Sequence, residues 1–218
     1  MVGASVTPRL TRMEQMRRVL WAIGLVGSPL LLLAYFLLSP AYGEIHGADI
    51  VRAVADDPGR MQMADVFAFG GTFLAIPAVL AYMHVLRPKS PLLASIGGGL
   101  ALLGWSALVG ALMLDLVAVE LVDHPAQFED VYAGGLVTAV SSLATLHVVG
   151  ALLLGIALLR TRLVGLPLGV AMTLAPPVHL AANLGGQLWL DAITWIVTAW
   201  VGVLLTRLVL GEDVSRSG

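Results

Sequence analysis

Six long runs of apolar residues, separated by short polar segments, constrain the fold of this chain more than any other feature. Each run is close to the 20 or so residues that an α-helix needs to cross a bilayer. The chain is 58% hydrophobic and only 12% charged, whereas about a quarter of an ordinary soluble sequence is charged. A soluble domain could not bury so much apolar surface, so the sequence predicts an all-α, polytopic bundle of helices in a lipid bilayer.

We expect one domain of six transmembrane helices over residues 19–210, after a basic N-terminal segment, 1–18, and before a short tail, 211–218. The first apolar run exceeds the apolar region of a secretory signal, about 7–15 residues, so we interpret it as an uncleaved span. The six expected spans cover residues 19–39, 63–86, 92–118, 133–159, 163–184 and 188–210.

The distribution of basic residues predicts the orientation of these spans, because Lys and Arg near span ends remain on the cytoplasmic side. Ten of the twelve basic residues flank one side of the expected bundle: Arg9, Arg12, Arg17, Arg18, Arg87, Lys89, Arg160, Arg162, Arg207 and Arg216. Only Arg52 and Arg60 fall on the other side. We therefore expect both termini in the cytoplasm and the protein in a bacterial inner (plasma) membrane.

Spans two and three and spans four and five form two hairpins of similar sequence. Residues 83–104 and 156–175 each contain the end of one span, an Arg-containing turn and a Gly-containing start of the next span. This likeness favours a parallel repeat about an axis along the membrane normal, although any two such turns look alike. Small residues at helical spacing, such as Gly97 and Gly104, let helix backbones approach closely, so we expect a compact bundle.

Polar side chains inside the expected spans are candidates for a functional site, because they are costly in hydrocarbon. Six of them fall in the outer third of the bundle: Asp65, Asp115, Glu120, His179, Asn183 and Asp191. We expect these residues to line a polar, outward-facing, ligand-binding cavity among spans two, three, five and six, with His46 and His124 in loops nearby. Helix capping is the alternative for Asp65 and Asp191, since each begins a span.

Span four carries His147 near its middle, and span five carries Pro176 and Pro177 at an expected helix break. The histidine could be buried against a hydroxyl or carbonyl group, or it could relay protons or contact a ligand. Consecutive prolines remove two backbone donors and bend a helix. The carbonyl groups freed in this way could form part of a solute or ion site with His179 and Asn183, and a simple kink is the alternative.

We expect no cofactor. The chain has no Cys, which excludes disulfides and thiolate metal sites, and it has no phosphate-binding loop. A haem held by two His needs both imidazoles at nearly equal depth, whereas we expect His84, His147 and His179 at the inner side, the middle and the outer side. An intramembrane metal site would need three protein ligands, and His179, Asp191 and a loop His leave that alternative open.

The stretch ADDPGRMQMADVFAFGGTFLAIPAVLAYMHVLRPKSPLLASIGGGLALLG, residues 55–104, covers the second and third expected spans. It resembles small bacterial multi-span membrane proteins of unknown function. The resemblance implies a multi-helix bundle and assigns no functional residues to this chain.

Three functions are compatible with these features. The first is an integral membrane protein with a structural, sensory or partner-binding role and no enzymatic activity, whose outer cavity holds an unidentified small molecule. The second is a small secondary carrier or channel that uses His147 and the Pro176-Pro177 break, and the third is an intramembrane metal-dependent hydrolase. The expected partner is the lipid bilayer, with a protein partner or a second copy of the chain as open alternatives. A net charge of -2 gives no argument for nucleic acid.

Overall fold

The computed structural model describes residues 11–211, and within this range the chain is all-α, with no strand. Expectations for residues 1–10 and 212–218, including Arg9 and Arg216, lie outside the described residues. The helices are, in chain order, α1 (Arg12–Leu38), α2 (Gly47–Asp56), α3 (Pro58–Leu86), α4 (Pro91–Glu120), α5 (Pro125–Tyr132), α6 (Gly135–Ala144), α7 (Leu146–Thr161), α8 (Leu166–Leu184) and α9 (Leu188–Leu210).

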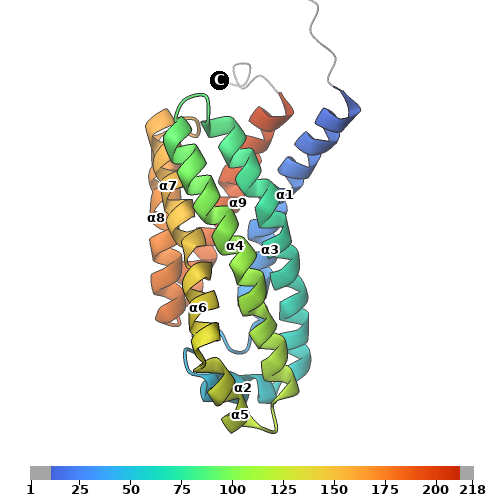
Figure 1. Ribbon diagram of the computed structural model, residues 1–218. Helices are drawn as coiled ribbons and strands as arrows, with labels where there is room; N and C mark the ends of the chain where they lie inside the picture. The colour runs from blue at the N-terminus through green and yellow to red at the C-terminus, as the bar shows by residue number, and fades with distance from the viewer. Residues whose placement is uncertain (1–10, 212–218) are drawn as a thin grey trace, which may run out of the picture.

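The long helices form a closed ring in chain order (Figure 1). α1 packs against α3, α3 against α4, α4 against α6 and α7, α7 against α8, α8 against α9, and α9 returns to α1. Consecutive long helices are antiparallel neighbours (Figure 1), as is usual for helix bundles. Each long helix therefore presents one face to the centre of the ring and another to the outside.

The outside of the ring is apolar. Leu92, Leu136 and Trp200, from three different helices, are 70%, 78% and 61% exposed, and a contiguous apolar surface of this kind indicates contact with a membrane. Five helical stretches are long and apolar enough to cross a membrane: Arg12–Leu38, Pro58–Leu86, Pro91–Glu120, Gly135–Thr161 and Leu188–Leu210. These features are those of an integral membrane protein. α8, which is shorter and contains Pro176 and Pro177, completes the ring between α7 and α9.

The start of α1, the end of α9 and the α3–α4 and α7–α8 turns lie at the same end of the ring (Figure 1). There Arg18 donates a hydrogen bond of 3.3 Å to the carbonyl group of Val209. α1 begins at Arg12, within the segment that we expected to precede the first span, and Thr11 caps it by accepting a hydrogen bond from Glu14 N. A parallel hairpin repeat requires the α3–α4 and α7–α8 turns to lie at the same end of the ring, as they do (Figure 1). The repeat itself stays a prediction.

The fourth expected span, 133–159, is not one continuous helix, because α6 ends at Ala144 and α7 begins at Leu146. Three hydroxyl side chains near the break donate to backbone carbonyl groups three or four residues earlier: Thr138, Ser142 and Thr145. Such hydrogen bonds compete with the helical ones and bend helices. Hydropathy does not register this competition, so it predicts the span, which corresponds to Gly135–Thr161, but not the interruption at Thr145.

α8 continues through Pro176 and Pro177, where we expected a helix break. The prolines cannot donate hydrogen bonds to the carbonyl groups of Met172 and Thr173. Pro176 and Pro177 nevertheless lie within a continuous helix. Packing against α7 on one side and α9 on the other holds α8 together. The helix break near the middle of the bundle is therefore at Thr145.

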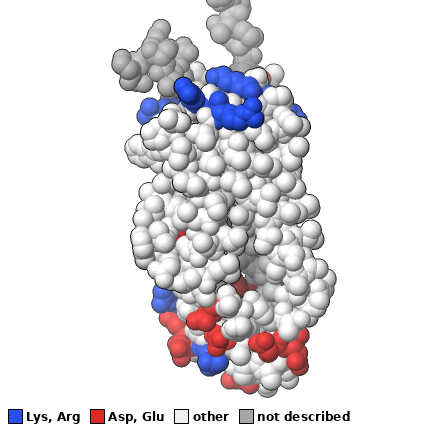
Figure 2. All heavy atoms as spheres, turned by 90° about the vertical axis from the view of Figure 1, so that its left-hand side faces the viewer, with Lys and Arg blue, Asp and Glu red and all other residues white. Residues whose placement is uncertain are grey.

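α2 and α5 are short helices that cover the other end of the ring (Figure 1). Val51 and Val54 of α2 and Phe128 of α5 are buried in one apolar cluster with residues of α3 and α4. Glu129 joins the two short helices by accepting a hydrogen bond of 2.8 Å from the backbone of Ala48. Asp and Glu gather at this end, whereas Lys and Arg gather at the opposite end (Figure 2).

Two glycines allow α4 and α7 to approach closely. A Cβ atom on Gly104 would overlap the backbone nitrogen of His147, and one on Gly150 would overlap the backbone nitrogen of Ala101. Gly99, on α4, would meet no atom within 4 Å. The expectation that small residues let helix backbones approach closely is therefore confirmed at Gly104. Gly99 has no such neighbour.

Substitution of Gly104 by Ala should destabilise the protein, whereas the same change at Gly99 should not. Both positions gain about 0.5–1 kcal/mol of helix propensity on becoming Ala, but only Gly104→Ala forces two backbones apart, which we expect to cost about 1–3 kcal/mol. Thermal unfolding of the two variants in the same detergent, followed by circular dichroism, measures the difference. Equal melting temperatures for both variants would contradict the close approach of α4 and α7.

Candidate functional site

A cavity of about 110 Å³ lies at the centre of the ring. It is lined by side chains from α1, α3, α4, α7, α8 and α9, so it exists only because the ring is closed. Most of its wall is apolar. His147 and His179 contribute its two imidazole groups, and Tyr82 and Thr194 are also among its lining residues.

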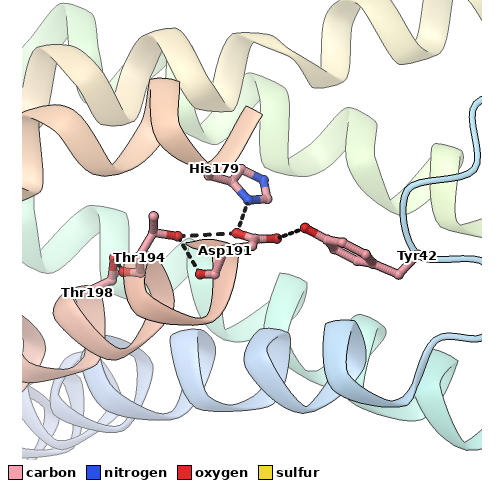
Figure 3. A network of polar contacts seen from close by, with 5 residues as sticks. All are labelled: Tyr42, His179, Asp191, Thr194 and Thr198. Carbon is pink, nitrogen blue, oxygen red and sulfur yellow. Dashed lines mark hydrogen bonds and ion pairs between the residues drawn. The ribbon is translucent and has the colours of Figure 1, made fainter. Parts of the chain in front are cut away.

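His179 on α8 contacts Asp191 in the first turn of α9 (Figure 3). The distance between His179 Nδ1 and Asp191 Oδ1 is 2.7 Å, and the side chain of Asp191 is 0% exposed. The turn between the two helices includes Gly186, whose φ of +63° is one that glycine adopts without strain. This tight turn brings two residues that are 12 positions apart into direct contact.

Asp191 is the centre of a larger polar network (Figure 3). Tyr42, in the connection between α1 and α2, donates a hydrogen bond of 3.2 Å to Asp191 Oδ2. The hydroxyl group of Thr194 lies 3.2 Å from Oδ1 and 2.8 Å from the backbone carbonyl oxygen of Asp191. Both carboxylate oxygens thus have partners, which offsets the large cost of burying this group.

The hydrogen bonds of the two histidines fix which ring nitrogen can accept. A carboxylate and a carbonyl group can only accept, so Nδ1 of His179 donates to Asp191 and Nδ1 of His147 donates to the backbone of Ala144. In the neutral imidazoles Nε2 then carries the free lone pair. The ring centroids of His147 and His179 are 6.3 Å apart. The cavity therefore holds two neighbouring imidazoles that are both oriented by their Nδ1 atoms.

Aromatic side chains surround both imidazoles. The ring of Trp105 lies 4.6 Å from that of His147, and the ring of Trp195 lies 5.1 Å from that of His179. Phe36 contacts His179 at 5.5 Å and stacks on Trp195 at 5.7 Å. Rigid aromatic walls with a few fixed polar groups are typical of sites for small molecules.

His147 and His179 are neighbours, whereas we expected them at different depths. His147 lies 15 residues before Arg162 and His179 lies 14 residues after Gly165, so both are about four helical turns from the α7–α8 turn. Counting from the shared turn, and not from the ends of the expected spans, would have shown this. The expectation that different depths exclude a haem held by two His therefore does not hold for His147 and His179.

The other predicted residues lie elsewhere. Asp115 and Asn183 line a second cavity, at the end that α2 and α5 cover. Asp65 is only 2% exposed, and neither of its carboxylate oxygens has a hydrogen-bond partner in the described part of the chain. Glu120 is exposed at the end of α4 and lines neither cavity, while Pro176 lines the central one. The six residues that we expected around one cavity therefore do not share one: His179 lines the central cavity, Asp115 and Asn183 line the second, and the other three line neither.

Sequence reasoning missed the aromatic and hydroxyl residues of the site, namely Phe36, Tyr42, Trp105, Thr194 and Trp195. Two signals could have indicated them. Trp residues usually gather at the membrane interface, whereas Trp105 and Trp195 lie well inside expected spans. Thr194 follows Asp191 by three residues, which places it on the same helix face.

Among residues 11–211, no three His, Asp or Glu side chains come together in a way that could hold a metal ion. The described part of the chain therefore offers no set of three metal ligands for the metal-dependent hydrolase that we kept as an alternative. No protein-family model, curated protein or solved structure matches this chain. The site is therefore interpreted from its geometry.

Replacing Tyr42 by Phe should lower the free energy of unfolding by about 0.5–1.5 kcal/mol at neutral pH, because Asp191 loses one donor. Burial and the negative charge of Asp191 raise the pKa of Tyr42 above its usual range. A hydroxyl group with a raised pKa stabilises the folded state below about pH 10, and this contribution is lost as the pH rises further. The gap between wild type and Tyr42→Phe should therefore narrow above pH 10.

Chemical denaturation at several pH values, followed by Trp fluorescence, measures this gap. Tyr82→Phe is a suitable control, since its buried hydroxyl group has no hydrogen-bond partner within residues 11–211. We expect that variant to be as stable as wild type at neutral pH. A Tyr42→Phe protein with unchanged stability would show that the hydrogen bond to Asp191 contributes nothing.

Proposed function

We propose that this chain is a non-enzymatic, ligand-binding membrane protein whose central cavity holds a small lipophilic molecule that carries a hydroxyl group. One observation carries the proposal: two oriented imidazoles, His147 and His179, line an otherwise apolar and aromatic cavity at the centre of a closed ring of helices. A sensory or carrier protein for such a molecule needs this combination of apolar volume and fixed polar groups.

The proposal includes six spans with both termini in the cytoplasm of a bacterial cell. α8 counts as the sixth span because it completes the ring between α7 and α9. The gathering of Lys and Arg at the end where α1 begins and α9 ends supports this orientation (Figure 2). The acidic end, with α2 and α5, then faces the periplasm.

The size and the wall of the cavity bound the ligand. An engineered apolar cavity of about 150 Å³ binds benzene, so a cavity of about 110 Å³ suits a single small ring or a short chain. The free Nε2 atoms of His147 and His179 accept from a hydroxyl group. Trp195 and Tyr82 line the same cavity, and the polar atom of each side chain is buried without a hydrogen-bond partner among the described residues. A ligand hydroxyl group can donate to either imidazole.

Phenol and toluene test this assignment, because they share a ring and differ in the hydroxyl group. We expect purified wild-type protein to prefer phenol, after correction for partition into the detergent, and His179→Phe or His147→Phe to lose about five- to tenfold of that preference, as one hydrogen bond of about 1 kcal/mol predicts. Quenching of Trp fluorescence reports binding. The control is His84→Phe, because His84 does not line the cavity. If all three variants keep the preference of wild type, the imidazoles do not bind the ligand.

A proton carrier is the second candidate, and a line of titratable side chains favours it. Tyr42, in a connection at the acidic end, contacts Asp191, which contacts His179. His147 follows at a ring distance of 6.3 Å. Chains of Asp and His inside membrane helices often form proton relays. This line runs from the acidic end of the molecule to the centre of the ring.

Proteoliposomes that contain a pH-sensitive dye test this second candidate. A proton carrier should dissipate an imposed pH gradient, and His179→Phe should abolish the flux whereas His84→Phe should not. Wild-type protein that leaves the gradient intact, with or without phenol, would exclude proton transport and leave the binding role in place.

A further inference from the structure

A second cavity, of about 180 Å³, lies at the acidic end of the ring, beneath α2 and α5. Its polar wall includes the carboxylate groups of Asp115 and Glu44. Its aromatic wall includes Tyr35, Phe36 and Tyr132. None of its lining residues lines the central cavity, so the two cavities are separate.

The carboxylate groups of this region have no basic partner in the described part of the chain. Asp115 accepts a hydrogen bond of 3.1 Å from the hydroxyl group of Tyr35, and the recorded ion pairs include neither Asp115 nor Glu44. The two basic residues at this end are engaged elsewhere. Arg52 pairs with Asp49, and Arg60 donates to the carbonyl group of Leu37. A negative charge on Asp115 is therefore uncompensated.

Asp65 is a second buried carboxylate group, on α3, one of the helices that contribute to this cavity. It follows Met61, which lines the cavity, by one helical turn, so the two residues lie on the same face of α3. The side chain of Asp65 is 2% exposed and both oxygens are unpartnered among residues 11–211. A buried carboxylate group in this state needs a cation or a proton.

We propose that this second cavity binds a small organic ammonium ion. Aromatic faces attract such cations, and neighbouring carboxylate groups add to the attraction. A divalent metal ion fits less well, because no three acidic or His side chains converge within the described residues. The ammonium group would lie between the aromatic wall and Asp115.

Tetramethylammonium and its neutral analogue neopentyl alcohol test this proposal by calorimetry on the purified full chain at constant ionic strength. We expect saturable binding of tetramethylammonium, at least about tenfold tighter than binding of the alcohol. Asp115→Asn and Asp65→Asn should each weaken it about tenfold or more, and the use of two variants guards against one that fails to fold. Asp123→Asn is the matched control, because Asp123 is an exposed acidic residue at the same end.

Three results would overturn the proposal: equal binding of the cation and the alcohol, unchanged binding in both Asn variants, or displacement of tetramethylammonium by an equal concentration of sodium. The last result would identify a site for inorganic cations. The phenol preference of the central cavity should survive in Asp115→Asn, so failure of this proposal and failure of the central binding role give different results.

Discussion

Polar side chains on the long helices cannot face hydrocarbon without a large cost, and the rest of the structure depends on this constraint. The ring satisfies it by placing apolar side chains such as Leu136 outside and polar ones such as Asp191 inside. Close packing is needed to keep the ring closed, and Gly104 and Gly150 permit it where α4 meets α7. The central cavity is a consequence of this arrangement.

Asp191 and Asp65 show two different outcomes of the same constraint. Both are almost completely buried, yet Asp191 has partners on both oxygens, from His179, Tyr42 and Thr194. Asp65 has none among the described residues. A satisfied carboxylate group orients its neighbours, and here it fixes the ring of His179. An unsatisfied carboxylate group is the stronger indication of a missing cationic partner.

The two cavities have no lining residue in common, but side chains that line one contact side chains of the other site. Tyr42 lines the second cavity and donates a hydrogen bond to Asp191, which in turn contacts His179 in the central cavity. Phe36 also lines the second cavity, and its ring contacts those of His179 and Trp195. Occupation of one cavity therefore has a direct physical route to the other, through two aromatic side chains that contact both.

The sequence by itself determined the all-α class, the long apolar helices and the segregation of acidic from basic residues, because length, hydropathy and charge are local properties. It also placed His147 near mid-span, and it supplied Asp115, His179 and Asp191 as candidates. Only the tertiary structure decided that His147 meets His179, that Asp191 meets Tyr42, and that His179 and Asp115 line two different cavities. Helices that are apolar on every side give no signal of which face turns inward. The rotation of each helix, and hence each side-chain contact, is set by packing against its neighbours. The helix break at Thr145 likewise depends on hydroxyl groups that compete for backbone carbonyl oxygens. A hydropathy profile does not include this competition.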